Sequence, residues 1–180
     1  MDSVLTVRSE SELTSLIGGL DHAGIVGIDG LTASGKSWAA HQLCSKLGWP
    51  IIGCDSFVRN GKLFYPQILD LAALKSALEH AQRPVLVEGV MLRLVLQAIG
   101  FSATHNVYVR RCNIDGSLCS PEFFESFSAA DMMAAENELC RLIGIKDNEP
   151  ILARELISYH EAFRPYESAD IVFDNSYGGS

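Results

Sequence analysis

The stretch Gly30-Leu31-Thr32-Ala33-Ser34-Gly35-Lys36-Ser37 decides the fold. Its glycines and its Lys-Ser ending have the spacing of a phosphate-binding loop (P-loop), in which backbone N–H groups turn inward around phosphate oxygens. Residues 24–29 before it suit a buried strand, and a helix is expected from about Ser37 to just before Gly48. A strand, this loop and a helix in succession predict a nucleotide-binding site, and the alternative is an ordinary glycine-rich turn.

The same stretch predicts which groups hold the nucleotide and its metal. We expect the backbone of residues 30–37, together with the adjoining Trp38, to bind ATP or GTP. Lys36 is placed to reach the β- and γ-phosphates as a catalytic cation, and the Ser37 hydroxyl is placed to ligate Mg²⁺. ATP and Mg²⁺ are therefore the expected cofactors.

Short apolar runs alternate with helical patterns along the rest of the chain. Strands are expected at 51–54, 85–87, 106–109 and 171–173, and helices at 10–20, 69–82, 91–99, 121–143 and 149–163. This alternation predicts right-handed crossovers and a parallel sheet covered on both faces. We expect an α/β fold of three layers (α/β/α), the P-loop nucleoside triphosphate hydrolase fold, with a five-stranded parallel sheet. One domain would span 1–180, with a variable helical lid at about 112–148.

Composition narrows the classes of partner and location. A formal net charge of −8 over 180 residues argues against long nucleic acid as a partner. The sequence contains no apolar run of roughly 18 residues and no signal peptide at its start, so we expect no membrane partner and a cytoplasmic location. The five cysteines lack metal-binding spacing and are expected to be reduced. A homo-oligomer is compatible with the sequence.

Polar residues gather where the expected strands end. Ligands of parallel sheets bind at the carboxyl ends of strands, where the loop 30–37, Asp55, Glu88, Arg110 and Arg111 all fall. Asp55, expected about one strand-width from the loop, is a candidate general base, with a helix cap as the alternative. Glu88 is a candidate for the Mg²⁺ site, with a helix N-terminal charge as the alternative.

At these residues the chain resembles the uridine kinase group of P-loop kinases, with pantothenate kinase and the nucleoside monophosphate kinases as wider relatives. The stretches that carry the resemblance are 28–37, Cys54-Asp55-Ser56-Phe57, Val87-Glu88-Gly89, Tyr159-His160, Pro165 and 169–172. The resemblance implies a kinase that transfers the γ-phosphate of ATP or GTP to a hydroxyl of a small, nucleoside-like molecule. It also implies that Asp55 accepts the hydroxyl proton.

Phosphoryl transfer needs cations over the developing charge, and kinases of this type supply arginines from a mobile lid. The candidates are Arg110, Arg111, Arg141, Arg154 and Arg164. Arg154 is the first choice for catalysis, and Arg111 is expected to contact the nucleotide by stacking on adenine. A solvated surface role is the alternative for each. Asp29, just before the loop, is a further candidate for a metal-bound water.

The chain departs from the uridine kinase pattern at Gln67, where the family has an aspartate that contacts the nucleoside. This change and an acidic lid argue against uridine itself and leave a different small hydroxyl compound open as the acceptor. Its pocket walls would be Phe57, Arg59, Phe64 and Tyr65, although aromatic residues there also suit the core. Two other functions stay open: a nucleotide-binding regulatory NTPase, and a degenerate kinase without turnover. The guanine-binding motif of GTPase switches is absent from the sequence.

Overall fold

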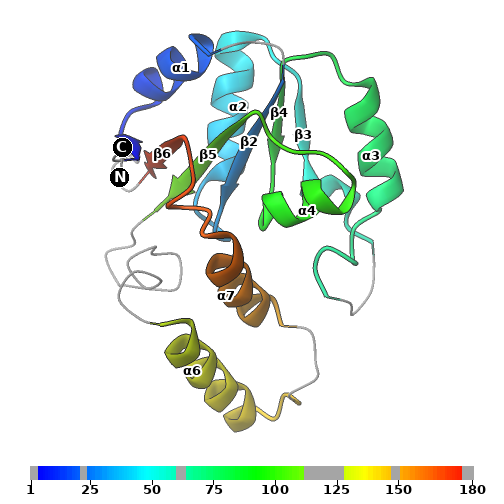
Figure 1. Cartoon of the computed structure of the whole chain (residues 1–180), viewed down its shortest axis with the longest axis vertical. Helices are drawn as coiled ribbons and strands as arrows, with labels where there is room; N and C mark the ends of the chain where they lie inside the picture. Colours follow the sequence, from blue (N-terminus) through cyan, green and yellow to red (C-terminus); the bar gives the residue numbers. More distant parts are fainter. Residues whose placement is uncertain (1–3, 21–23, 60–63, 112–127, 147–150, 176–180) are drawn as a thin grey trace.

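One parallel sheet organises the chain. The computed structural model describes residues 4–20, 24–59, 64–111, 128–146 and 151–175. In these ranges six strands pair in the order β1-β6-β5-β2-β4-β3, every pair parallel (Figure 1). The strands are β1 (Leu5–Val7), β2 (Ile25–Gly30), β3 (Ile51–Gly53), β4 (Val85–Glu88), β5 (His105–Arg110) and β6 (Ile171–Asp174).

The predicted α/β fold is confirmed, with one strand more than the five expected. The additional strand, β1, has three residues and lies at the edge of the sheet beside β6. So short a strand carries too little alternation for its pattern to be recognised in the sequence.

Helices connect the strands and cover both faces of the sheet. They are α1 (Glu10–Gly18), α2 (Lys36–Leu47), α3 (Leu71–His80), α4 (Leu92–Ala98), α6 (Ala129–Leu142) and α7 (Leu152–Phe163), with a 3₁₀ turn η1 (Cys54–Phe57). The expected start of a helix at Pro121 lies outside the described residues. Within them, α6 begins after Ser128, whose side chain accepts a hydrogen bond from the Asp131 N–H.

Local sequence signals fix several of these helix ends. Ser9 and Glu12 form a reciprocal capping box at the start of α1. Gly48 ends α2 with φ of 72°, a left-handed conformation that glycine adopts without steric cost. Asp70 caps α3 by accepting the Ala73 N–H. These caps fix where α1 and α3 begin and where α2 ends.

Alternation along the strands divides the core into two layers. Ile25 and Val85 pack with residues of α3 and α4 on one face. Their neighbours Val26 and Leu86 pack with residues of α1 and α2 on the other. Each of these side chains is at least 96% buried, which stabilises the fold by about 1.5–3 kcal/mol per residue. The two layers hold the sheet rigid beneath its loops.

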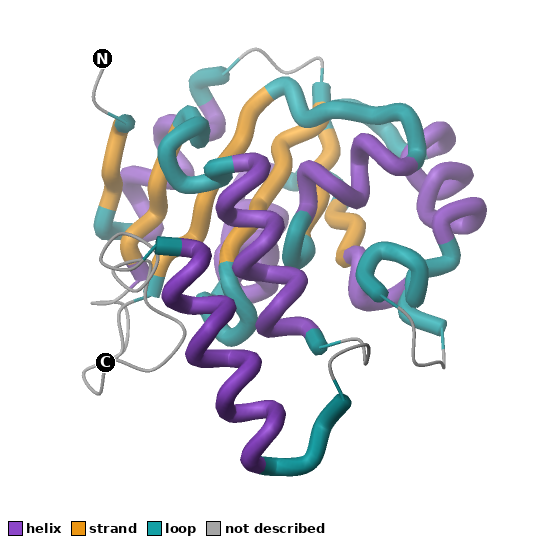
Figure 2. The backbone as a smooth tube through the Cα atoms, turned by 60° about the horizontal axis from the view of Figure 1, so that its bottom comes forward, coloured by secondary structure: helices purple, strands orange, loops and turns teal. Residues whose placement is uncertain are grey.

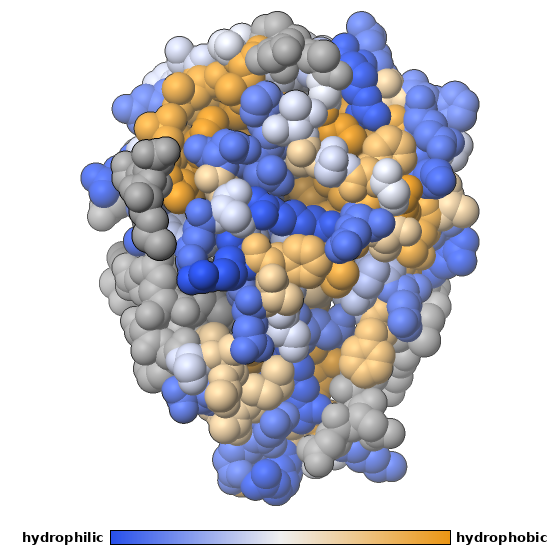
Figure 3. Space-filling view, in the orientation of Figure 1, coloured by the Kyte–Doolittle hydropathy of each residue, from blue (hydrophilic) through white to orange (hydrophobic). Residues whose placement is uncertain are grey.

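Helices α6 and α7 lie beside the carboxyl ends of the central strands, away from α1 (Figure 1), and run side by side (Figure 2). On the face shown in Figure 3, apolar residues form several patches separated by hydrophilic ones. Among the described residues, no helix is long and apolar enough to span a membrane.

Candidate phosphate-binding and catalytic site

The loop between β2 and α2 forms a tight backbone cradle. Gly30, Ala33 and Gly35 have φ values of 150°, 62° and 96°. A Cβ on Gly30 would lie 2.4 Å from the Val109 carbonyl oxygen, and one on Gly35 would lie 2.3 Å from Nδ2 of Asn175. Both positions therefore need glycine. The cradle opens onto the N-terminus of α2, where backbone N–H groups and the helix dipole favour an anion.

Lys36 provides the positive charge at this cradle. It is the first residue of α2, is only 7% exposed, and its Nζ donates a 2.7 Å hydrogen bond to the Leu31 carbonyl oxygen. Its ammonium also interacts favourably with the carboxylates of Asp29 and Glu88. An ammonium held at the end of the loop is well placed to contact phosphates that bind to the loop.

Ser37 and Glu88 meet across the site. The Ser37 hydroxyl donates to Oε2 of Glu88 at 3.2 Å. Glu88 ends β4, level with Ile28 of β2 and Gly53 of β3, and a Cβ on Gly53 would lie 2.8 Å from its Oε1. Burial raises the pKa of the Glu88 carboxyl, and the Ser37 hydroxyl and the Lys36 ammonium oppose that shift.

A hydroxyl beside a carboxylate is a suitable pair of oxygen ligands for Mg²⁺. This ion usually takes one or two protein ligands and completes its octahedron with water and substrate phosphates. Among the described residues, no group of three or more His, Cys, Asp or Glu side chains is placed to hold a metal ion. Ser37 and Glu88 are therefore the residues that would hold Mg²⁺.

Asp55 follows β3, a strand that lies two places from β2 in the sheet rather than next to it. It is on η1 after β3, and β4 separates β3 from β2, so two strand spacings, roughly 10 Å, lie between the two strand ends. Along the chain β3 is the next strand after β2, but the sequence does not reveal that β4 pairs between these two strands. Asp55 is exposed, and its charge acts on Glu88 and Cys54, so it still borders the same edge.

Asp29 joins three elements beneath the cradle. Its Oδ1 accepts the Gly30 N–H at 2.7 Å, and its Oδ2 accepts the hydroxyl of Tyr159 on α7. The Leu92 N–H at the start of α4 also acts on this carboxyl. Burial raises the pKa of Asp29, and these donors oppose that shift. These protein donors give Asp29 a structural role in addition to the metal-water role that the sequence left open.

The sequence did not predict the hydrogen bonds that Tyr159 and Asn175 make near the loop. Asn175, just after β6, donates from Nδ2 to the Ser34 carbonyl oxygen at 3.2 Å and is 8% exposed. Since the C=O and N–H of a trans peptide point in opposite directions, this bond turns the Gly35 N–H away from Asn175. In the sequence, only its position directly after the last strand could have indicated that Asn175 lies near the site.

The candidate arginines occupy different surroundings. Arg154 is half-buried on α7, whereas Arg111 is exposed just after β5. Arg110 pairs with Asp174 at 3.8 Å and donates to the Tyr166 hydroxyl at 3.1 Å. The other two form ion pairs on the surface, Arg141 with Glu138 and Arg164 with Glu167. Arg154 is thus the candidate that the fold brings into a cavity wall.

Trp38 is 42% exposed in the first turn of α2, and its ring stacks on Phe173 of β6 with centroids 6.3 Å apart. The expected wall residues Phe57 and Arg59 do not line the cavity described below. Phe57 packs against the core, and Arg59 pairs with Asp70 at 2.6 Å. Gln67 is exposed in a turn.

A cavity of about 350 Å³ lies between α7, the start of α4 and the segment 64–65. Phe64 and Tyr65, two of the expected walls, line it together with Met91, Arg154 and Tyr159. Tyr159 thus has its ring in the cavity wall and its hydroxyl on Asp29, directly before the cradle. The wall of the cavity is therefore connected through Tyr159 to the residue that precedes the loop.

The parallel sheet and the loop between β2 and α2 define a P-loop α/β fold. A solved structure, that of a possible uridine kinase from Bacillus stearothermophilus, is similar to this chain at 19% sequence identity with a TM-score of 0.53. The match covers 92% of this chain and 97% of that one. No known protein-family model matches the sequence, and no curated protein matches it as a relative.

Proposed function

We propose that this protein is a phosphotransferase that moves the γ-phosphoryl group of ATP, or GTP, to a hydroxyl of a small molecule. The observation that carries the proposal is the convergence of Lys36, Ser37 and Glu88 at one cradle. A cavity lined by Tyr159, whose hydroxyl bonds to Asp29 just before the loop, further supports the proposal. A P-loop fold hosts many chemistries, so the proposal rests on this site rather than on the fold.

In the proposed reaction the acceptor oxygen forms a bond to the γ-phosphorus as the bond from that phosphorus to the leaving diphosphate oxygen breaks. The acceptor proton passes to a carboxylate, for which Asp55 is the exposed candidate at this edge. Lys36 and the loop N–H groups hold the phosphates, and Arg154 is the candidate cation on the acceptor side. Mg²⁺, when bound, neutralises charge on the β- and γ-oxygens.

The cavity beside α7 is the proposed acceptor site. Its volume lies in the range of small-molecule pockets, roughly 300–1,000 Å³. Its wall residue Met91 follows Glu88 by three positions, and Tyr65 lies against Gly89. An acceptor held there would have its hydroxyl at the edge of the sheet where the phosphates bind.

The proposal is tested by incubating the protein with Mg²⁺, ATP and a panel of alcohols, nucleosides and sugars, and following phosphorus by NMR. We expect a phosphate monoester to appear with wild type and to be absent with Lys36→Ala. Release of inorganic phosphate alone, with every acceptor, would instead support a regulatory NTPase. The melting temperature of Lys36→Ala must first show that the variant folds.

A further inference from the structure

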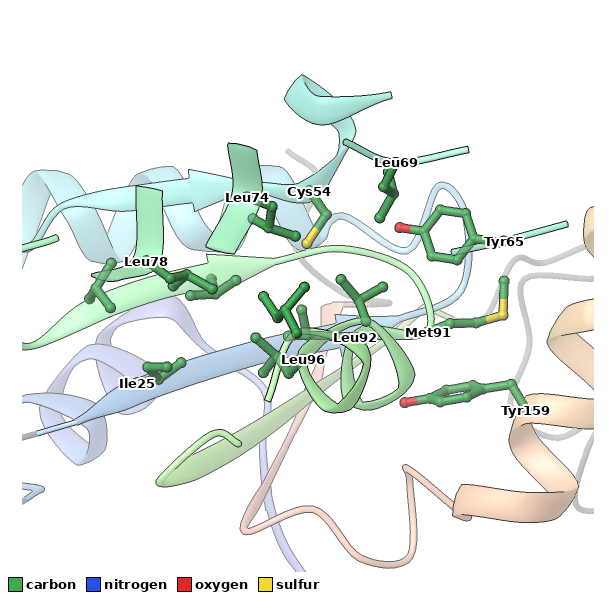
Figure 4. Close-up of a cluster of buried hydrophobic side chains, with 14 of the residues drawn as sticks. Ile25, Cys54, Tyr65, Leu69, Leu74, Leu78, Met91, Leu92, Leu96 and Tyr159 are labelled. Atoms are coloured by element: carbon green, nitrogen blue, oxygen red, sulfur yellow. The ribbon is translucent and has the colours of Figure 1, made fainter. Parts of the chain in front are cut away.

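Building on the proposed function, we infer that the acceptor is an alcohol with a flat, apolar body, held between α7 and the segment 64–65. Three of the buried side chains labelled in Figure 4, Tyr65, Met91 and Tyr159, line this cavity, and in that view Met91 lies between the two tyrosine rings. Leu94 and Phe163 continue the apolar lining. Tyr65, Met91 and Tyr159 are 8%, 1% and 3% exposed, so they form an apolar floor against which a flat apolar group would lie.

Three polar residues around the cavity, Glu155, Ser158 and Tyr159, form hydrogen bonds within the protein. Glu155 Oε2 accepts the Tyr65 N–H at 2.5 Å, and the Ser158 hydroxyl donates to the Arg154 carbonyl oxygen at 3.1 Å. The Tyr159 hydroxyl is bonded to Asp29. An acceptor with many hydroxyls would lose water contacts here without regaining them from these groups.

The ends of the cavity differ in a way that orients such a molecule. Phe64 is 46% exposed, so the side it lines is open to solvent. At the inner side the Tyr65 hydroxyl is buried, has no hydrogen-bond partner among the described residues, and lies 3.9 Å from where a Cβ on Gly89 would be. Because Gly89 follows Glu88, a single hydroxyl on the inner end of the acceptor would meet the phosphate site.

The experiment compares 2-naphthylmethanol with uridine and glycerol as acceptors, with Mg²⁺ and ATP, by the rate of phosphate ester formation. We expect kcat/KM for 2-naphthylmethanol to exceed that for uridine by at least about tenfold, a difference of about 1.4 kcal/mol. Uridine or glycerol as the better acceptor would overturn the inference and leave the proposed function in place.

A pair of variants tests the location. Ala162 is exposed on α7 and lines the cavity, so Ala162→Trp fills it without disturbing the core. Ala72 is exposed on α3 outside the cavity lining, and Ala72→Trp is the matched control. We expect KM for 2-naphthylmethanol to rise at least about tenfold in Ala162→Trp only, with the Kd of a non-hydrolysable ATP analogue unchanged in both.

These readouts separate the inference from the function on which it rests. If wild type binds the ATP analogue with Mg²⁺ but forms no ester from 2-naphthylmethanol, the inferred acceptor class is wrong. Equal KM values in Ala162→Trp and Ala72→Trp would show that the acceptor does not bind in this cavity. If folded wild type does not bind the analogue at all, the proposed function fails first, and the inferred acceptor class fails with it.

Discussion

Removing the Tyr159 hydroxyl tests how α7 supports the phosphate cradle. Tyr159→Phe deletes a donor to a buried carboxylate, and hydrogen bonds to charged groups contribute about 1.5–3 kcal/mol. We expect the free energy of unfolding to fall by that amount. Asp29 also accepts the Gly30 N–H at 2.7 Å, so a shift of its carboxylate changes the start of the loop. If about 1 kcal/mol of this loss weakens the loop that binds nucleotide, the Kd for nucleotide rises roughly fivefold.

Tyr108→Phe is the matched control for this variant. The Tyr108 hydroxyl bonds to Nε2 of His160, also on α7, at 2.9 Å, so the control likewise removes one hydroxyl between the sheet and this helix. Its partner is a histidine rather than a carboxylate; burial lowers the pKa of His160, and the contact of its Nδ1 with the Leu156 carbonyl oxygen at 2.8 Å opposes that shift. We expect a loss of about 1 kcal/mol in stability and an unchanged nucleotide Kd.

Denaturant unfolding gives the stability of each variant, and calorimetric titration with a non-hydrolysable ATP analogue and Mg²⁺ gives the Kd. The distinguishing result is a weaker Kd in Tyr159→Phe alone. If both variants lose stability but bind nucleotide as wild type does, Tyr159 only holds the helix. The link from α7 through Asp29 to the cradle would then be refuted.

Three further predictions concern single residues. Asp55→Asn should retain nucleotide binding and lose roughly 10²-fold in transfer rate, the low end for a positioned base, and an unchanged rate would exclude Asp55 as the base. Ser37→Ala and Glu88→Gln should each raise the Mg²⁺ concentration needed for activity, and unchanged Mg²⁺ titrations in both would remove them from the metal site. Burial raises the pKa of Cys54 to about 12, so iodoacetamide at pH 8 should label it more slowly than half-buried Cys44 by peptide mass spectrometry, whereas equal labelling would contradict that burial.

The sequence predicted what local chemistry determines. The loop 30–37 follows its strand and opens its helix as expected, and the capping box at Ser9 and the terminal Gly48 lie where their residue types indicate. Such features depend on neighbours within a few residues, which a single sequence contains.

What the sequence did not predict depends on distant pairing. Asp29 and Tyr159 are 130 positions apart, and Asn175 is 141 positions from Ser34, so no local pattern connects them. The strand that precedes Asp55 lies two places from β2 because β4 pairs between β2 and β3, an order that alternating strands and helices leave open. The cavity beside α7 likewise forms from three segments that meet only in the fold.

Calorimetric titration of wild type and Lys36→Ala with Mg²⁺ and a non-hydrolysable ATP analogue tests the phosphate cradle most directly. We predict binding of one nucleotide per chain to wild type, and a Kd at least about tenfold weaker in a folded Lys36→Ala, because the phosphates lose the buried cation at the loop. Equal Kd values in the two proteins, or no binding to folded wild type, would contradict the assignment of residues 30–37 as a nucleotide site.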